Sequence, residues 1–504
     1  MSLQRNILAS FASQIYVALV GIAMVPMYVK YMGAEAYGLV GFFAMLQAWF
    51  NLLDIGLTPT IAREAARHRG GASDALSYRR LVRTLEIIFL AIALAGAAAV
   101  LAGAGYIARD WLRVSQLPAS EVLAAVRLMA PIIAMRWMAG LYRGALGGAE
   151  RLVWLGWFNA AIATLRFSGV LPLLMFVGTS PTLFFGYQLV VALVELAVLF
   201  AYTYRQLPSV AAGARPRWDL TALKPVLRFS LTIAFTSSVW VFVTQTDKLV
   251  LSSILPLAEY GYFTLAVLVA SGIMILSGPV GSAIMPRMAK LEAEGAHAQL
   301  IRVYRQGTQL VALVAGATSI TVAFGAEALL WAWTGDAVLA RQAAPVLVLY
   351  AVGNGVLAVS AFPYYLQFAK GNLRLHLIGN AAFVGLLIPL VIWAATEFGA
   401  MGAGYVWLGM NLVSFVAWLP LVHRKFEPGL NRHWYGNDIA IIVAATAVVG
   451  YLASHLLPPS GPRVNQFADI VLAGLMALLA GAAASSAIRA RVRTLWQTQK
   501  LSHP

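Results

Sequence analysis

The sequence predicts an all-α membrane protein with about 14 transmembrane helices. Hydrophobic residues make up 61% of the 504 residues and charged residues only 11%, and the mean hydropathy is +0.77. This composition is far more apolar than that of a soluble domain, so lipid must be the main solvent of the chain. Fourteen apolar runs are long enough to cross a bilayer core, which needs about 20 residues per helix.

The predicted spans follow one another with short connections, which leaves no room for a separate soluble domain. They share length and apolar composition, and they lie at 9–29, 37–59, 84–106, 121–145, 152–177, 182–204, 226–253, 260–286, 303–325, 342–369, 374–396, 400–422, 437–457 and 467–488. The first run lacks a small-residue cleavage site and is expected to be retained as a span.

Basic residues alternate between the two ends of these spans. Most of the 36 lysines and arginines lie before the first span, after even-numbered spans and after the last one. Cytoplasmic connections are enriched in Lys and Arg, so the alternation predicts an even number of spans with both termini cytoplasmic. It also accounts for the net charge of +16 without a nucleic-acid partner. The opposite ends hold only Lys30, Arg109, Arg113, Arg341 and Arg463.

A short motif recurs at the start of each half of the chain. AEAYG (34–38) follows the first span, and AEYG (258–261) follows the seventh. A repeat after six spans runs in the same direction in both halves, as in one known construction plan of membrane transporters. The expected organisation is an N-lobe at 1–210, a C-lobe at 211–425 and an appended helix pair with a basic tail at 426–504.

These features resemble the polysaccharide (O-antigen type) lipid-linked oligosaccharide flippases of the multidrug/oligosaccharidyl-lipid/polysaccharide exporter superfamily. The resemblance rests on the acid–Tyr–Gly turn, on TDK (246–248) near the end of the seventh span and on Pro26 in the first span, and it covers about residues 1–425. It implies a bacterial inner-membrane flippase that moves undecaprenyl-pyrophosphate-linked oligosaccharide outward by alternating access, for surface polysaccharides such as the O-antigen of lipopolysaccharide. The implied partners are this glycolipid, membrane lipids and other polysaccharide-assembly proteins. No cofactor is expected, and H⁺ or Na⁺ is the candidate coupling ion.

Charged side chains within the spans are candidate functional residues because each costs several kcal/mol in lipid. Arg166 and Glu195 lie at similar distances from the turn between their spans, near Ser180, so they could meet near the midplane. Asn159 lies seven residues before Arg166 and shares its helix face. Two interpretations stay open: an Arg166–Glu195 ion pair that closes the hairpin, or a polar cavity lining between the lobes in which Arg166 holds an anion.

The remaining charges complete the predicted site. Arg136 lies near the middle of its span and is expected to face the cavity, whereas Arg127, nine residues earlier, points to the opposite side. Asp247 and Lys248 are adjacent and are expected to point in different directions. Because arginine forks bind pyrophosphate well, the predicted substrate-binding residues are Arg136, Arg166, Lys248 and Asn159. Glu195 and Asp247 are the predicted charge-balancing or ion-coupling residues, and Pro26 is the predicted hinge.

Three alternatives have different sequence requirements. A cation-coupled multidrug antiporter of the same superfamily is expected to carry a carboxylate in the first span, but 9–29 contains no Asp or Glu. The peptidoglycan-precursor flippase is expected to carry arginines in its first, second and eighth spans, which have none here. A membrane glycosyltransferase or polymerase would need a large external loop with catalytic acids, and the longest such connection, 107–120, is short. We therefore expect no enzymatic activity, no catalytic residues and no metal site.

Overall fold

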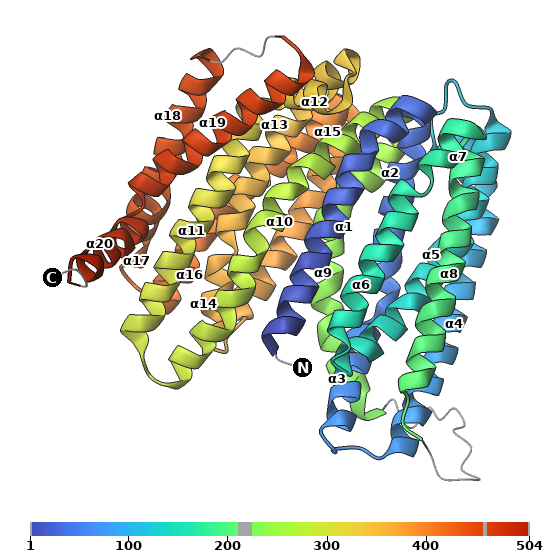
Figure 1. Ribbon diagram of the computed structural model, residues 1–504, viewed down its shortest axis with the longest axis horizontal. Helices are drawn as coiled ribbons and strands as arrows, with labels where there is room; N and C mark the ends of the chain where they lie inside the picture. The colour runs from blue at the N-terminus through green and yellow to red at the C-terminus, as the bar shows by residue number, and fades with distance from the viewer. Residues whose placement is uncertain (1–2, 210–223, 457–460, 502–504) are drawn as a thin grey trace. The chain divides into compact units, whose positions relative to one another are not determined.

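The computed structural model describes residues 3–209, 224–456 and 461–501. Helices make up nearly all of this described part, and an isolated bridge between Arg113 and Pro256 is the only β-type pairing in it. The predicted all-α class is therefore confirmed. The chain divides into two compact units, Met1–Gly261 and Tyr262–Pro504, which are treated separately below (Figure 1).

The first unit is built around one long, buried helix, α5, which packs against α3, α4 and α8. Figure 1 shows α1, α6 and α8 as neighbouring helices of this unit. The helix α10 (Leu257–Ala293) begins here and continues into the second unit. The other helices are α1 (Leu3–Met32), α2 (Ala34–Phe50), α3 (Leu57–Arg69), α4 (Ala75–Tyr106), α5 (Ala119–Gly148), α6 (Leu152–Ala163), α7 (Leu171–Phe176), α8 (Pro181–Gln206) and α9 (Lys224–Ile254).

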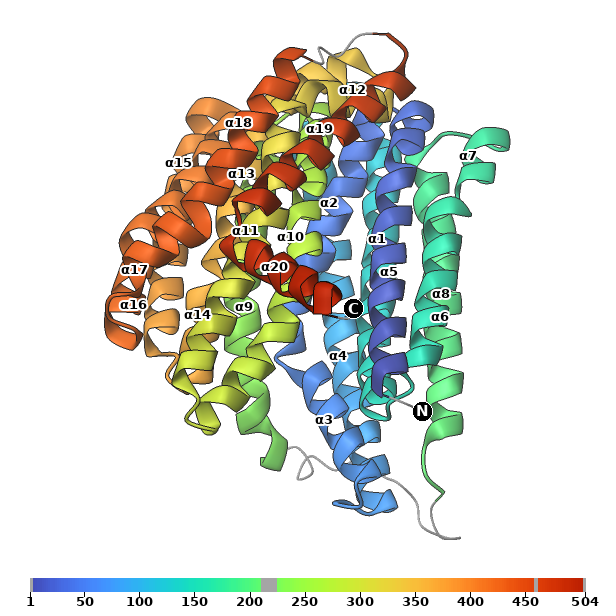
Figure 2. The ribbon, with the colours of Figure 1, turned by 60° about the vertical axis from the view of Figure 1, so that its left-hand side comes forward.

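The second unit is centred on α11, which packs against α13, α18 and α19. Figure 2 shows α18 and α19 side by side, with α20 following α19 at the end of the chain. The helices of this unit are α11 (His297–Phe324), α12 (Ala326–Thr334), α13 (Ala337–Ser360), α14 (Phe362–Ala369), α15 (Arg374–Val413), α16 (Leu419–Phe426), α17 (Leu430–His433), α18 (Ile441–Leu456), α19 (Arg463–Ala484) and α20 (Ser486–Leu501).

The number of candidate spans agrees with the prediction of about 14. Twelve helical stretches in the described residues are long and apolar enough to cross a membrane. One of them, Arg374–Phe426, has 53 residues, which is too long for a single span. Gly399 interrupts it with φ 57, so it contains two of the predicted spans. The 31-residue helix α9 is not among the twelve and corresponds to the predicted seventh span.

The outer surfaces of the spans suit a lipid environment. Large apolar side chains are exposed along them, including Leu19 and Leu94, each 61% exposed, and Leu479, which is 71% exposed. Soluble monomers rarely expose large apolar side chains over so much of their surface. Helices also satisfy their backbone hydrogen bonds internally, as the bilayer core requires. The protein is therefore a multi-span membrane protein.

The two copies of the recurring motif lie against each other within the first unit. A Cβ atom added to Gly38 would lie 2.2 Å from the carbonyl oxygen of Leu257, and one added to Gly261 would lie 2.7 Å from that of Ala34. Glycine is thus required in both copies because the starts of α2 and α10 touch through their backbones.

The unit boundary falls after α9, since α9 packs against α2 and α3. The predicted division into 1–210, 211–425 and 426–504 was based on the sequence repeat, whereas the two units are defined by packing. The division into lobes therefore stays a prediction.

A pair of glycines spaced four residues apart lets α3 approach α5 closely. A Cβ atom on Gly148 would lie 1.9 Å from the carbonyl oxygen of Ala62, and one on Gly144 would lie 2.8 Å from that of Thr58. This spacing is the small-residue pattern by which membrane helices bring their backbones together. It holds the ends of α3 and α5 in contact.

Replacing Gly148 by leucine should therefore destabilise the first unit. Forcing a larger side chain into a packed contact costs about 1–3 kcal/mol, so the midpoint of thermal unfolding in detergent should fall by several degrees. Gly147 is the matched control, because nothing lies within 4 Å of a Cβ atom added there. Equal unfolding midpoints for Gly148→Leu and Gly147→Leu would contradict the close contact.

Candidate functional site

A buried carboxylate on α8 is the centre of a charged cluster in the first unit. Glu195 is 3% exposed, and its Oε1 atom accepts a hydrogen bond from Nη1 of Arg143 at 2.7 Å. Its Oε2 atom lies 4.0 Å from Nε of Arg136. Both arginines are on α5, and the seven residues between them are about two helical turns, so they share one face of the helix. One carboxylate therefore pairs with two cations.

Two side-chain amides also accept hydrogen bonds from these arginines. Arg136 donates from Nη2 to Oε1 of Gln188 at 2.7 Å, and Arg143 donates from Nε to Oδ1 of Asn159 at 3.2 Å. Gln188 lies two turns before Glu195 on the same face of α8. The polar faces of α5 and α8 thus meet inside the unit, and α6 contributes Asn159. The structure brings Arg136, Asn159 and Glu195 together, three of the residues selected from the sequence.

The local backbone of α8 is well specified by its sequence. Ser180 accepts a hydrogen bond on its side chain from the backbone N–H of Leu183 at 3.2 Å, and Pro181 occupies the first turn. Serine at the N-cap and proline at the first helical position are favoured starts of a helix. The start of α8 fixes the register that places Gln188 and Glu195 toward α5.

Arg166 lies beside this cluster in a π-helical turn, Thr164–Ser168, which follows α6. Side chains of α8 donate hydrogen bonds to two backbone carbonyl groups of this turn. Gln188 donates from Nε2 to the Arg166 carbonyl at 2.9 Å, and Tyr187 donates to the Leu165 carbonyl at 2.8 Å. The guanidinium of Arg166 lies 4.5 Å from the ring centre of Phe167. Single π turns within helices occur frequently at functional sites.

The Arg166–Glu195 ion pair considered from the sequence is not formed. In the described part of the chain, the ion pairs of Glu195 are those with Arg136 and Arg143. The physical reason is that α5 packs directly against α8 and presents two arginines to the carboxylate. The π turn also adds a residue to the helical register before α8, so spacing counted on a regular helix does not place Arg166 correctly.

The cluster carries more positive than negative charge. Arg136 and Arg166 are both within electrostatic range of Arg143 and Glu195. Three arginines and one carboxylate leave a net charge of about two positive units in a site where Arg136 and Glu195 are buried and the other two arginines are half-buried. Such an excess is costly in a membrane protein unless the site faces water or binds an anion. The chemistry of the cluster therefore favours an anionic ligand.

Asp247 and Lys248 form an ion pair of their own on α9. Nζ of Lys248 lies 3.2 Å from Oδ1 of Asp247 and donates to the carbonyl of Thr244 at 2.6 Å. The expectation that these neighbours point in different directions is wrong, because the long lysine side chain folds back along the helix. Asp247 is 5% exposed, so its pairing with Lys248 reduces the cost of burying its charge.

Arg143 is the functional candidate that the sequence interpretation missed. It lies near the end of the predicted span 121–145, where an arginine is also typical of the start of a basic connection. Its spacing of seven residues from Arg136 was the available signal, because residues seven apart lie on the same face of a helix.

Arg127 is exposed on α5, in agreement with its expected direction. Pro26 lies inside the continuous helix α1, and its role as a hinge stays a prediction.

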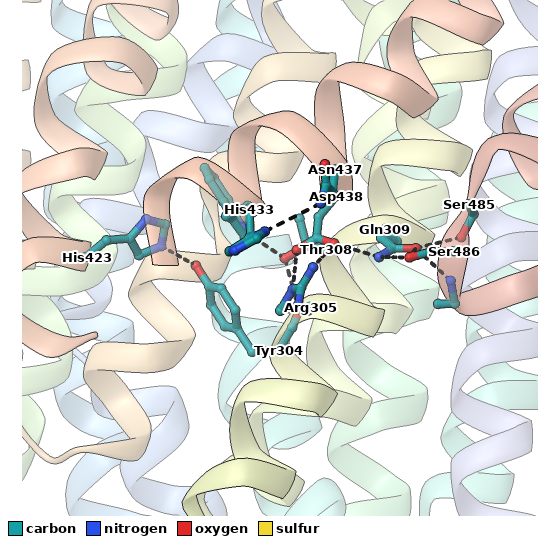
Figure 3. Close-up of polar contacts among 12 residues, drawn as sticks. Tyr304, Arg305, Thr308, Gln309, His423, His433, Asn437, Asp438, Ser485 and Ser486 are labelled. Carbon is teal, nitrogen blue, oxygen red and sulfur yellow. Dashed lines mark hydrogen bonds and ion pairs between the residues drawn. The ribbon is translucent and has the colours of Figure 1, made fainter. Parts of the chain in front are cut away.

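A second buried polar cluster, in the second unit, is fully paired (Figure 3). Arg305 donates to both carboxylate oxygens of Asp438, at 2.7 and 3.0 Å, and Asp438 is completely buried. Gln309 donates to Asp438 at 2.6 Å and accepts from Ser485 at 2.8 Å and from the backbone N–H of Ala487 at 2.9 Å. Since its charges balance, this cluster is best explained as the attachment to α11 of the π-helical turn before α18, which contains Asp438, and of the junction between α19 and α20. Within the described ranges, no three potential metal ligands lie together.

Comparisons with known proteins agree with this architecture. Residues 3–292 match the family model described as polysaccharide biosynthesis protein. Among solved structures, the chain is similar to the lipid II flippase MurJ in an inward closed conformation, with a TM-score of 0.73 and 12% identity, covering 94% of this chain and 98% of that one. No curated protein matches the sequence in a direct search.

Two further solved structures have the same kind of fold. An inward-facing multidrug resistance MATE family transporter of the MOP superfamily has a TM-score of 0.66 and 14% identity, covering 82% of this chain and 96% of that one. A MOP superfamily transporter from Pyrococcus furiosus has a TM-score of 0.55 and 14% identity, covering 84% and 94%. Identities this low establish a shared fold. The family match spans more than half of the chain, and the protein therefore belongs to the polysaccharide biosynthesis protein family, with the fold of MOP superfamily transporters.

Proposed function

We propose that this protein is a flippase that moves undecaprenyl-pyrophosphate-linked oligosaccharide across the bacterial inner membrane during surface polysaccharide synthesis. The observation that carries the proposal is the excess of arginine around Glu195, since the substrate has an anionic pyrophosphate. Membership of the polysaccharide biosynthesis family and the MOP superfamily fold are consistent with this activity. O-antigen or another lipopolysaccharide glycan is the proposed cargo class.

The proposed binding step is an exchange of anionic partners. Arg136 and Arg143 are held by Glu195 and by the amides of Gln188 and Asn159 before substrate arrives. The pyrophosphate oxygens then replace the carboxylate, because a planar guanidinium makes paired hydrogen bonds to phosphate. Arg166 needs no carboxylate to be displaced first and provides an additional cation.

Glu195 and Asp247 are proposed to couple transport to an ion. Binding of H⁺ or Na⁺ at either carboxylate would weaken its hold on the neighbouring cation, Arg143 or Lys248, and would free that cation for substrate. Transport then follows alternating access, with both termini cytoplasmic and with Pro26 as a hinge of α1. The membrane partners are the glycolipid, bulk lipids and other polysaccharide-assembly proteins.

The direct test is transbilayer movement of a fluorescent polyprenyl-pyrophosphate oligosaccharide in liposomes that contain the purified protein. We expect movement of this glycolipid and no accumulation of a cationic drug such as rhodamine 6G in the same vesicles. The physical reason is that a net positive site repels cations and attracts pyrophosphate. Protein-free liposomes give the rate of spontaneous glycolipid movement, and the Arg166→Ala variant gives the rate without this proposed binding residue.

A cation-coupled multidrug antiporter is the second candidate function, because MATE family transporters share the fold. Two observations oppose it: the first predicted span contains no Asp or Glu, and the charged cluster is net positive. Drug transport without glycolipid movement would overturn the flippase proposal and would favour this candidate. A membrane glycosyltransferase is a weaker candidate, since the similar solved structures are transporters or flippases.

A further inference from the structure

A cleft with a volume of about 390 Å³ lies within the first unit, away from the Glu195 cluster. Its polar lining comes from the ends of α3 and α8, from the first turn of α4 and from the turn between α5 and α6. It includes His68, Arg69, Tyr78, Arg151, Thr203 and Gln206. Thr203 follows Glu195 by eight residues on α8, which is about 12 Å along the helix axis. The volume lies in the usual range of small-molecule sites.

The sequence brings two helix ends together to form this cleft. The close contact of Gly144 and Gly148 with α3 aligns the end of α3 with the end of α5. After α5, Glu150 adopts a left-handed conformation with φ 56, which ends the helix and turns the chain. Arg151 consequently joins Arg69 in the wall of the cleft, although 82 positions separate them in the sequence.

The cations of the cleft are only partly neutralised. Arg69 donates from Nη1 to the carbonyl of Ala149 at 2.5 Å, and its Nη2 lies 3.2 Å from Oε2 of Glu150. Arg151 is exposed, and no ion pair of its side chain occurs among the described residues. The lining thus has two arginines for one neighbouring carboxylate. Nδ1 of His68 is occupied by the Ser73 carbonyl at 2.9 Å, and the ring stacks on Tyr78.

A buried hydroxyl supplies an independent indication of a ligand. Thr203 is 2% exposed and lines the cleft, yet its hydroxyl oxygen has no hydrogen-bond partner in the part of the chain that the structure describes. Threonines within helices commonly bond the carbonyl four residues earlier, as Thr246 and Thr318 do here. Buried polar groups are nearly always paired, so an unpaired one in a cleft wall marks a position for a ligand atom.

We propose that this cleft is a phosphate-binding site, separate from the transport site of the proposed function. The Thr203 hydroxyl donates to one phosphate oxygen, and the forks of Arg69 and Arg151 bind the others. The cleft lies at the ends of the spans that carry the basic connections, so the phosphate can belong to an anionic lipid headgroup or to a soluble compound. The proposal does not depend on the identity of the transported substrate.

Lipid binding to the full-length protein tests the site in the absence of glycolipid. The probes are phosphatidylglycerol against phosphatidylcholine, followed in detergent by native mass spectrometry, and glycerol 3-phosphate, followed by calorimetry. We expect Thr203→Val and Arg151→Gln each to weaken binding of a phosphate probe about tenfold, the effect of one lost charge-assisted hydrogen bond. Arg80→Gln is the matched control, because Arg80 is exposed nearby on α4 and does not line the cleft.

The two probes separate the two sources of phosphate. Variant-sensitive binding of phosphatidylglycerol alone identifies a lipid headgroup site, and variant-sensitive binding of glycerol 3-phosphate identifies a site for soluble phosphate compounds. Equal binding by the wild type, Arg151→Gln and Arg80→Gln for both probes would overturn the proposal. Arg151 is on the surface, so this comparison remains decisive even if Thr203→Val does not fold. A negative result in these binding experiments does not bear on the flippase proposal, which is tested separately by the liposome transport assay.

Discussion

Replacing Arg166 by alanine is expected to reduce glycolipid movement in liposomes about a hundredfold while the protein still folds and inserts. Arg166 has no ion pair with Glu195, so its removal leaves no buried carboxylate unpaired. Two charge-assisted hydrogen bonds to pyrophosphate are worth about 3 kcal/mol together, which corresponds to a factor of about 100. The measurement is the initial rate of glycolipid movement, with the midpoint of thermal unfolding determined in parallel.

Arg127→Ala is the matched control for this experiment. Arg127 is also an arginine within a predicted span, but it is exposed on the face of α5 away from Arg136. We expect its replacement to leave the transport rate within about twofold of the wild type. Normal transport by Arg166→Ala would remove Arg166 from the proposed site. Equal losses in both variants would indicate a general effect of charge rather than a specific contact.

Replacing Glu195 by glutamine is expected to have the largest effect on stability. The substitution keeps the size of the side chain but leaves the buried Arg136 and the half-buried Arg143 without a counter-charge. Removal of one partner from a buried ion pair costs about 3–5 kcal/mol. The midpoint of thermal unfolding in detergent should therefore fall by several degrees or more.

A double-mutant cycle distinguishes this explanation from a simple packing defect. Arg143→Gln combined with Glu195→Gln removes one cation together with the carboxylate, so the double variant should be more stable than Glu195→Gln alone. A pyrophosphate compound added to Glu195→Gln should also raise its unfolding midpoint, because ligand binding to the folded state stabilises it. Additive losses in the double variant, with no effect of pyrophosphate, would show that the cluster does not act as an anion site.

The sequence predicted the spans well because the relevant property is local. A residue in lipid must be apolar wherever it lies in the fold, and a helix satisfies its own backbone hydrogen bonds. The predicted span 121–145, for example, corresponds to α5 (Ala119–Gly148). Short helices such as α3 and α12 were not anticipated, because they lie in the connections and carry no span-length apolar run.

By itself, the sequence determined the membrane class, the approximate number of spans, the recurring motif and the polar faces that contain Arg136, Asn159 and Glu195. Only the tertiary structure decided which charges are partners. Glu195 pairs with Arg136 and Arg143 rather than with Arg166. The physical reason is that hydropathy and helix periodicity belong to each segment alone. An ion pair instead depends on which helices pack together and on register changes such as the π turn at Arg166.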